Sequence, residues 1–243
     1  MKSIERFADL LNYSTISEWR NKVFRLGNDF GYEKVLLAIF PDCNSPMEAE
    51  YAFLHSNYSS DWRKRYDENK LGHVDPTVSH CLSKSTPLIW TPGIFSAEKQ
   101  KNMYEEACKY GLRSGVTLPI HGARGEFGVL CFVSDIEPTQ HFQHRVIHSL
   151  AELSCLRDYI FESSFRFIKK ICPANERVSI TTRELECLKW SASGKNSWEI
   201  GELLNCTEAT VNFHFSNIRR KFETKSRQQA VVRAIKLGII DPI

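Results

Sequence analysis

A stretch near the C-terminus constrains the fold of this chain more than any other: residues 197–222, SWEIGELLNCTEATVNFHFSNIRRKF. Its apolar residues recur at helical spacing on both sides of Asn205-Cys206-Thr207, a break with turn chemistry in which Thr207 suits a helix N-cap. The expected inward faces consist of Ile200, Leu203 and Leu204 in the first helix and of Val211, Phe215, Ile218 and Phe222 in the second. Two short helices joined in this way are typical of a helix-turn-helix, whose second helix enters the major groove of DNA.

The charge of the chain is concentrated around this helix pair. The net charge is +3, and residues 174–243 hold 11 lysines and arginines against 8 acids, while the other 21 of each sign cancel. Residues 219–227 contain five basic side chains and one acid, Glu223. A solvated helix face gives the same run of charge. Beside a helix-turn-helix, we interpret it as a surface for DNA phosphates.

Helix-capping signals extend this unit in both directions. Thr181-x-x-Glu184 precedes the helix pair and Ser226-x-x-Gln229 follows it, and each has the pattern of a capping box. A glycine lies beyond each of the two helices that these boxes open, where a helix commonly ends. We therefore expect an all-α domain of four helices at residues 177–243.

The rest of the chain mixes strands and helices. Residues 169–176 contain a proline and no periodicity, which indicates a linker after a first domain at 1–168. Within that domain the patterns predict helices at 3–12, 16–29, 75–83, 98–111 and 141–167, and a short helix or irregular segment at 61–69. They also predict strands at 34–40 and 49–57, a polar loop at 41–48, and a hairpin at 116–135 with GARGE as its turn. Because no βαβ rhythm is present, we expect an α+β chain whose first domain is an α/β/α sandwich around an antiparallel sheet.

Composition and hydropathy argue against a disordered chain, a membrane-spanning protein and a secreted protein. At 42% hydrophobic residues the chain can bury a core, and none of its eight cysteines forms a C-x-x-C pair. No apolar run approaches the length of a membrane span, and the charged N-terminus MKSIERFADLL does not resemble a signal peptide. We expect a reduced cytoplasmic protein with no membrane partner.

Catalysis and metal binding are not expected. His80 and Cys81 are adjacent, but neighbouring side chains on a helix point about 100° apart, so the imidazole is poorly placed to activate the thiol. The sequence contains no nucleophile elbow, zinc-ligand pair or phosphate-binding glycine loop. The prediction is a protein that is not an enzyme and has no metal or cofactor.

Residues 58–90 suggest a site for a small ligand instead. The candidates are Tyr58, Trp62, Arg63, Tyr66, Asp75, Thr77 and Trp90. Aromatic rings supply apolar walls, and a few polar groups orient a ligand's head. Core and rim aromatics would give the same residue types. Asp75 beside an apolar core needs a donor, however, and the amide N–H of a ligand would serve.

At these residues the sequence resembles the LuxR family of acyl-homoserine-lactone receptors, which are quorum-sensing transcription factors. The matching positions are Trp62, Tyr66, Asp75, Pro76, Trp90 and Gly115 in the first domain and Glu184, Leu188 and Gly194 in the second. The pieces NYSSDWRKRY, VDPTVSHC, HGARGE, KNSWEI and NFHFSNIRRKF are most similar to the Las-type branch, whose ligands are long 3-oxo-acyl lactones.

The resemblance implies a role for each residue of the pocket. Trp62 donates to the lactone carbonyl and Tyr58 to the amide carbonyl. Asp75 accepts the ligand amide N–H with help from the Thr77 hydroxyl, and Arg63 reaches the 3-oxo group through water. The remaining residues expected at the site are Tyr66 and Trp90 around the head, Leu36, Ala38, Ala52, Leu54, Val78, Met103, Ala107 and Leu112 along the acyl tail, and Thr117 and Cys131.

Three positions depart from the Las-type pattern. That branch has a serine where this chain has Cys131, and a thiol is the weaker donor. Hydrogen bonding to the amide carbonyl then falls mostly on Tyr58, at a cost of ~0.5–1.5 kcal/mol in head-group affinity. Met103 replaces an aromatic residue and Ala38 a glycine, so the acyl length remains open.

The expected mechanism couples the two domains. An empty pocket would leave Asp75 unpaired and its apolar walls unfilled, so ligand binding stabilises the first domain. Folded domains then form a homodimer, with helix 141–167 either at the interface or packed within the domain, and the dimer binds a palindrome in double-stranded promoter DNA. Expected base contacts are Asn212, Phe213 and Ser216, and expected phosphate contacts are Lys195, Ser197, Thr207, Thr210, Arg219, Arg220 and Lys221. The family implies activation by recruiting RNA polymerase.

Three alternatives stay open. A LuxR-type solo regulator would sense a different small amphiphile, and some family members repress transcription. A phosphorelay regulator with the same C-terminal domain would need clustered acids after the first strand and a phospho-accepting aspartate. Residues 34–48 offer one aspartate, Asp42, beyond the strand and no parallel-sheet rhythm.

Overall fold

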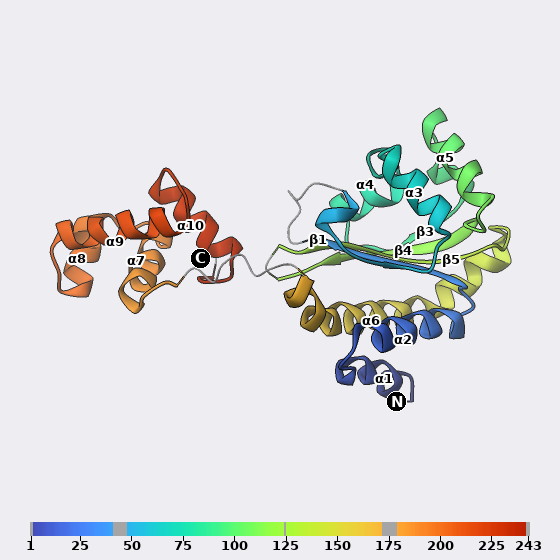
Figure 1. The fold of residues 1–243 in the computed structure, drawn as a ribbon, viewed down its shortest axis with the longest axis horizontal. Helices are drawn as coiled ribbons and strands as arrows, with labels where there is room; N and C mark the ends of the chain where they lie inside the picture. Colours follow the sequence, from blue (N-terminus) through green and yellow to red (C-terminus); the bar gives the residue numbers. More distant parts are fainter. Residues whose placement is uncertain (1, 41–47, 124, 172–178, 242–243) are drawn as a thin grey trace. The chain divides into compact units, whose positions relative to one another are not determined.

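The computed structural model describes residues 2–40, 48–123, 125–171 and 179–241, without the side chains of 2–4, 169–171 and 236. Most of the predicted loop at 41–48, one residue of the GARGE turn and the predicted linker beyond residue 171 lie outside these residues. The chain divides into two compact units, residues 1–171 and 172–243. Each is described separately (Figure 1).

The first unit contains helices and strands in alternation. Its helices are α1 (Lys2–Ala8), α2 (Ile16–Asp29), α3 (Ser60–Glu68), α4 (Pro76–Ser83), α5 (Glu98–Cys108) and α6 (Gln140–Ile171), with short 3-10 turns η1 (Asp9–Asn12), η2 (Ala49–Tyr51), η3 (Leu71–His73) and η4 (Pro92–Ile94). Its strands are β1 (Lys34–Phe40), β2 (Phe53–Ser56), β3 (Leu88–Ile89), β4 (Ser114–His121) and β5 (Phe127–Ser134).

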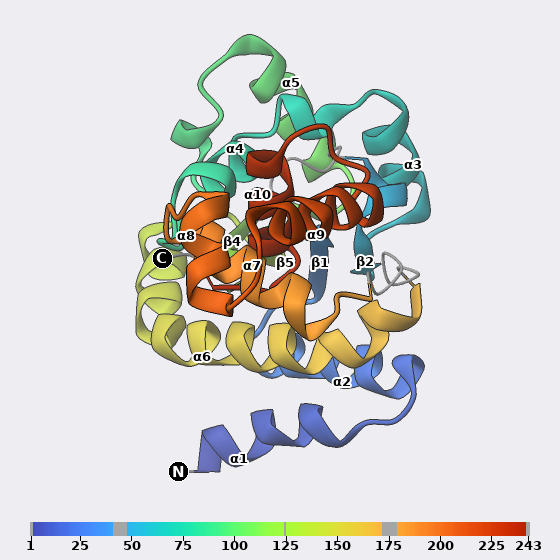
Figure 2. The ribbon, with the colours of Figure 1, turned by 90° about the vertical axis from the view of Figure 1, so that its left-hand side faces the viewer.

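The five strands form one antiparallel sheet in the order β2-β1-β5-β4-β3. Helices α2 and α6 cover one face, with α1 outside them, while α3, α4 and α5 lie over the other (Figures 1 and 2). The predicted α/β/α sandwich with an antiparallel sheet is confirmed.

Alternation along the strands creates two different cores. On the α2–α6 side, Leu37 and Phe132 pack with fully buried Trp19 and Leu156. On the opposite side the sheet presents smaller residues, including Ala38 and Cys131, toward α3–α5. Successive side chains of a strand point to opposite faces, so one sheet supplies a filled core and a wall for a cavity.

The second unit is all-α, as predicted. Its helices are α7 (Thr182–Ala192), α8 (Ser197–Leu204), α9 (Glu208–Lys221) and α10 (Arg227–Lys236). Capping boxes open α7 at Thr181 and α10 at Ser226, and a third, not foreseen, opens α8 at Asn196. The turn between α8 and α9 depends on Gly201, because a Cβ there would lie 2.7 Å from the Cys206 carbonyl oxygen.

Three local expectations differ from the structure. Leu203 is 47% exposed and does not share the buried face of α8. That face is formed by Ile200, Gly201 and Leu204, and Leu203 lies about 100° from its centre. The strand expected at 49–57 is shorter, because η2 occupies Ala49–Tyr51, and α6 continues to Ile171 rather than ending at residue 167.

Candidate functional site

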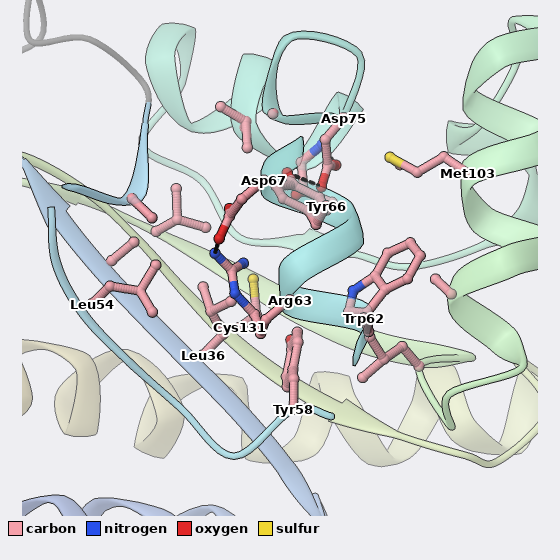
Figure 3. Close-up of a pocket in the computed structure, with 18 of the residues that line it drawn as sticks. Leu36, Leu54, Tyr58, Trp62, Arg63, Tyr66, Asp67, Asp75, Met103 and Cys131 are labelled. Atoms are coloured by element: carbon pink, nitrogen blue, oxygen red, sulfur yellow. Dashed lines mark hydrogen bonds and ion pairs between the residues drawn. The ribbon is translucent and has the colours of Figure 1, made fainter. Parts of the chain in front are cut away.

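A cavity lies between the sheet and helices α3, α4 and α5 (Figure 3). It encloses about 870 Å³ of empty space, including the part that opens to solvent. It is lined by Leu36, Ala38, Phe40, Ala49, Leu54, Tyr58, Trp62, Arg63, Tyr66, Asp67, Gly72, Asp75, Thr77, Val78, Trp90, Phe95, Met103, Tyr104, Ala107, Leu112, Val129 and Cys131. Its lining of aromatic and aliphatic walls with a few polar side chains is typical of a site for a small amphiphile.

Asp75 is held at the polar end of the cavity. It is the N-cap of α4, and its Oδ1 accepts a hydrogen bond of 2.8 Å from the Thr77 amide. Its Oδ2 accepts one of 3.0 Å from the Tyr66 hydroxyl. Burial raises the pKa of Asp75, and the hydrogen bonds from Thr77 and Tyr66 oppose that rise. The expectation that Asp75 is unpaired in an empty pocket was wrong, because Tyr66, expected only as a wall, supplies a donor.

Tyr58 and Trp62 direct polar hydrogens toward the same space (Figure 3). The buried Tyr58 hydroxyl makes no hydrogen bond to a described nitrogen or oxygen atom, and the neighbouring Cys131 thiol is only a weak partner for it. Burial raises the pKa of Tyr58 well above its ordinary value, so the phenol stays a neutral donor. Trp62 is 3% exposed and packs its ring against Tyr66 and Tyr110. An unpartnered buried donor is costly, which favours a ligand acceptor at this point.

Arg63 enters the cavity in a fixed position. Its Nη2 lies 2.8 Å from Asp67 Oδ1 and 3.1 Å from Oδ2, and its guanidinium carbon lies 5.3 Å from the centre of the Tyr66 ring. Asp67 was not among the predicted residues, although it follows Arg63 by one helical turn. The ion pair holds the arginine on the wall of the cavity and leaves other N–H groups to donate.

Trp90, Thr117 and Cys131 form a chain of contacts. The Trp90 indole N–H donates to Thr117 Oγ1 across 2.7 Å, and Thr117 Oγ1 lies 3.3 Å from Cys131 Sγ. The Trp90 amide donates to the Gly115 carbonyl, and a Cβ on Gly115 would lie 2.6 Å from the Phe132 carbonyl oxygen. Burial raises the pKa of Cys131 to about 12, so it remains a thiol.

The expected and observed linings differ at a few positions. Ala52 and Thr117 are outside the lining, Thr117 being fully buried behind it. The lining residues that sequence reasoning missed are Phe40, Ala49, Asp67, Gly72, Phe95, Tyr104 and Val129. Phe40 and Val129 share the strand alternation of Ala38 and Cys131 and were accessible to pattern analysis. The others come from turns and helices whose positions depend on tertiary packing.

The free face of α9 carries the side chains expected to meet bases. Asn212, Ser216 and Phe213 are exposed, Phe213 by 63%. Thr207 caps the helix by accepting the Thr210 amide at 3.2 Å. Apolar residues of α9 face inward and leave this surface to solvent, as the helical period predicts.

The basic and hydroxyl residues expected to contact phosphates around α9 differ in whether they are already bonded to other side chains. Arg219 and Arg220 are exposed, and their hydrogen bonds to other described residues are long, at 3.4 Å, and stay within their own helix. Lys195 forms an ion pair of 3.0 Å with Glu199. Both guanidinium groups, of Arg219 and Arg220, are therefore accessible to an anion such as a DNA phosphate.

Lys221 and Ser197 have structural partners instead of open positions. Lys221 Nζ lies 2.6 Å from Glu184 Oε2 and donates to the Ser179 carbonyl. Burial raises the pKa of Glu184, but hydrogen bonds from Lys221 and the Thr181 amide outweigh it and hold the pKa below its ordinary value. Ser197 Oγ lies 2.7 Å from Asn212 Oδ1.

Metal binding and membrane insertion require side-chain clusters and helices of particular kinds. Within the described ranges, no group of three or more histidine, cysteine or acidic side chains is arranged to hold a metal ion. Across the same ranges, no helix combines the length and apolar character needed to span a bilayer.

Comparisons with known proteins agree on both halves of the chain. Residues 15–164 match the autoinducer binding domain, and residues 178–234 match bacterial regulatory proteins of the luxR family. The transcriptional activator VanR of Vibrio anguillarum is 33% identical over 217 residues, covering 89% of this chain and 88% of the relative. The activator LuxR of Aliivibrio fischeri is 33% identical over 211 residues, covering 85% and 81%.

Solved structures show the same fold. Escherichia coli SdiA has a TM-score of 0.72 at 23% identity and covers 95% of this chain and 94% of its own. SdiA in complex with octanoyl-rac-glycerol has a TM-score of 0.74 at 21% identity, covering 95% and 92%. These relatives are regulators and not enzymes. The chain therefore belongs to the LuxR family of autoinducer-binding transcriptional activators.

Proposed function

We propose that this protein is a quorum-sensing transcription factor that binds an N-acyl-homoserine lactone, forms a homodimer and then activates transcription from palindromic promoter DNA in the cytoplasm. Residues 1–168 bind the lactone, residues 169–176 link the domains, and residues 177–243 bind DNA. The observation that carries the proposal is the apolar cavity with Tyr58, Trp62 and Asp75 directed into it.

The polar end of the cavity fits the lactone and amide groups. Trp62 donates to the lactone carbonyl, and Tyr58, whose hydroxyl is unpartnered, donates to the amide carbonyl. Asp75 accepts the ligand amide N–H, since a carboxylate has lone pairs left after accepting from Thr77 and Tyr66. Arg63 binds the 3-oxo group of a Las-type ligand.

The apolar walls supply the driving force. Each CH₂ group of an acyl tail buried against Leu36, Leu54 and Met103 contributes about 0.8 kcal/mol. Because Asp75 is already paired, the energetic penalty of the empty state rests on Tyr58 and on the unfilled walls. A ligand that binds only the folded domain stabilises it by mass action.

Dimerisation and DNA contact follow from the two exposed helices. The homodimer interface lies on α6, whose outward side carries the exposed Ile147. On α9, Asn212, Phe213 and Ser216 meet base edges, and Arg219 and Arg220 lead the phosphate contacts. A dimer presents two such helices to half-sites of a palindrome, and the bound activator recruits RNA polymerase.

Thermal unfolding of the full-length protein with a series of acyl lactones tests the ligand. We expect the melting temperature to rise most with long 3-oxo-acyl chains. One fold relative was solved with octanoyl-rac-glycerol, so a monoacylglycerol series is the matched competitor. A larger shift with monoacylglycerols than with any lactone would identify a solo regulator of another amphiphile. A promoter reporter that falls when ligand is added would identify a repressor.

A further inference from the structure

Arg227 joins four parts of the second unit. It is the first residue of α10, and its Nε donates to Ser191 Oγ across 2.7 Å at the end of α7. Its Nη2 donates to the Lys195 carbonyl at 2.8 Å, and its Nη1 donates to Ser197 Oγ at 3.1 Å. Its guanidinium carbon lies 4.1 Å from the centre of the Phe215 ring on α9. These directed contacts from one planar group leave the guanidinium a single orientation.

Ser197 connects Arg227 to the exposed face of α9 through two hydrogen bonds. Its hydroxyl accepts a hydrogen bond from the Arg227 cation, so its own hydrogen is free to be donated. The acceptor is Asn212 Oδ1, at 2.7 Å. A hydroxyl that accepts from a cation is polarised and becomes a better donor. The carbonyl end of the Asn212 amide is therefore turned toward α8, and its Nδ2 group is left for the outside.

The arrangement limits what Asn212 can read. Asparagine recognises adenine in the major groove by using its oxygen and its nitrogen together. Because the oxygen is turned toward Ser197, the amide presents its Nδ2 donor outward, and that donor suits an acceptor such as adenine or guanine N7, guanine O6 or thymine O4.

We infer that Arg227 is a positioning residue, which acts through Ser197 to hold Asn212 with its Nδ2 donor facing a base acceptor in the major groove. The inference rests on the proposed DNA-binding function and adds the residue that determines specificity at one base pair. Arg227 itself touches no base. It acts by reducing the freedom that an exposed asparagine would otherwise lose on binding.

Selection from a randomised duplex pool tests the inference. The full-length protein is used with a long-chain 3-oxo-acyl-homoserine lactone as the probe ligand, in wild-type form and as Asn212→Ala, Ser197→Ala and Arg227→Lys. All three variants should lose about 2- to 10-fold of base discrimination at the same base pair and its symmetry mate. Discrimination elsewhere, and affinity for a non-specific duplex, should stay within about 2-fold of wild type.

Matched controls separate positioning from general packing. Ser193→Ala removes an exposed hydroxyl that bonds only within α7, and Arg233→Lys is a charge-preserving change on α10 at an arginine with no ion pair among the described residues. Both should keep the wild-type base profile. Ser197→Ala leaves the contacts of Arg227 with Ser191, Lys195 and Phe215 in place, so it decides the question even if Arg227→Lys does not fold.

Three results would overturn the inference. Asn212→Ala is expected to lose base discrimination at one base pair. If Ser197→Ala keeps wild-type discrimination at that base pair, the hydrogen bond from Ser197 does not position Asn212. If the Arg227 and Ser197 variants lose base discrimination equally at all base pairs and melt at a lower temperature, the two residues serve packing alone. Failure of the wild-type protein to enrich any motif would refute the proposed sequence-specific DNA binding, and the inference with it.

Discussion

The Tyr66 hydroxyl donates a hydrogen bond of 3.0 Å to Asp75 Oδ2, while Asp75 Oδ1 caps helix α4. One carboxylate thus caps a helix and lines the cavity at the same time. Its two oxygens are oriented before any ligand arrives, which reduces the entropy that binding must overcome.

Replacing Asp75 with asparagine should separate these two roles. Asparagine is as good an N-cap as aspartate, so the fold should survive. Its Oδ1 is then needed by the Thr77 amide, and its NH₂ group faces the Tyr66 hydroxyl and the ligand amide, where an acceptor is required. We expect lactone affinity to fall by about 1–3 kcal/mol, measured as the concentration that half-saturates the melting shift. Asp61→Asn, on the exposed side of α3, should leave that concentration unchanged, and an unchanged value for Asp75→Asn would remove Asp75 from the site.

Tyr66→Phe should change the pH dependence of binding. Burial raises the pKa of Asp75 and the Tyr66 hydrogen bond lowers it, so losing that bond raises the pKa further. In the proposed binding mode the ionised carboxylate accepts the ligand N–H, so affinity should decline as pH falls through the pKa of Asp75. In Tyr66→Phe this decline should begin at a higher pH. Titrations of lactone affinity against pH measure it, with the exposed Tyr51→Phe as control, and superimposable profiles would contradict the coupling.

Cys131→Ser should tighten lactone binding. A hydroxyl is a stronger donor than a thiol, and the side chain at this position already lies 3.3 Å from Thr117 Oγ1. The expected gain is ~0.5–1.5 kcal/mol, measured by ligand titration of the melting temperature. Cys206→Ser in the second unit should have no effect on the same titration, whereas weaker binding by Cys131→Ser would show that the thiol serves as an apolar wall.

The stability of the second unit should depend on Glu184 at acid pH. Its folded-state pKa is below the ordinary value of 4.5, so the stability it contributes is fully present above pH 4.5 and is lost as pH falls through the folded-state pKa. Glu184→Gln should flatten that dependence and lower the free energy of unfolding at neutral pH by about 1–3 kcal/mol. Chemical denaturation at several pH values measures both. The exposed Glu202→Gln is the control, and an unaltered pH profile in Glu184→Gln would exclude the ion pair with Lys221 as its cause.

Arg220→Ala and Lys221→Ala should differ although the residues are adjacent. Arg220 is exposed, so its loss should weaken specific and non-specific DNA binding alike and reduce the salt slope by about 1. Lys221 is paired with Glu184, so its loss should mainly destabilise the domain. DNA affinity at several salt concentrations, with melting temperatures for both variants, distinguishes them. A loss confined to one base pair in Arg220→Ala would show that it contacts a base.

Local sequence patterns were sufficient to predict much of the fold. The stripe of α9, the capping boxes at Thr181 and Ser226 and the antiparallel hairpin all depend on residues close together in the chain. They failed at Leu203, because helical spacing alone does not say which side of a short helix meets its neighbours. Residue types also indicated Tyr58, Trp62 and Asp75, since aromatic groups and a lone acid in one segment are characteristic of a polar-headed ligand site.

The sequence by itself determined the fold class, with an α/β/α part before an all-α part, the periods of the helices and strands, and the chemistry present in residues 58–90. Tertiary structure alone decided which polar groups are free and which are paired. Lys221 meets Glu184 across 37 residues, and Arg227 meets Ser197 across 30. A local period reports only the direction in which a side chain points. Which residue a side chain pairs with depends on how separate helices pack. That packing pairs Lys221 with Glu184 and leaves the adjacent Arg220 exposed to solvent.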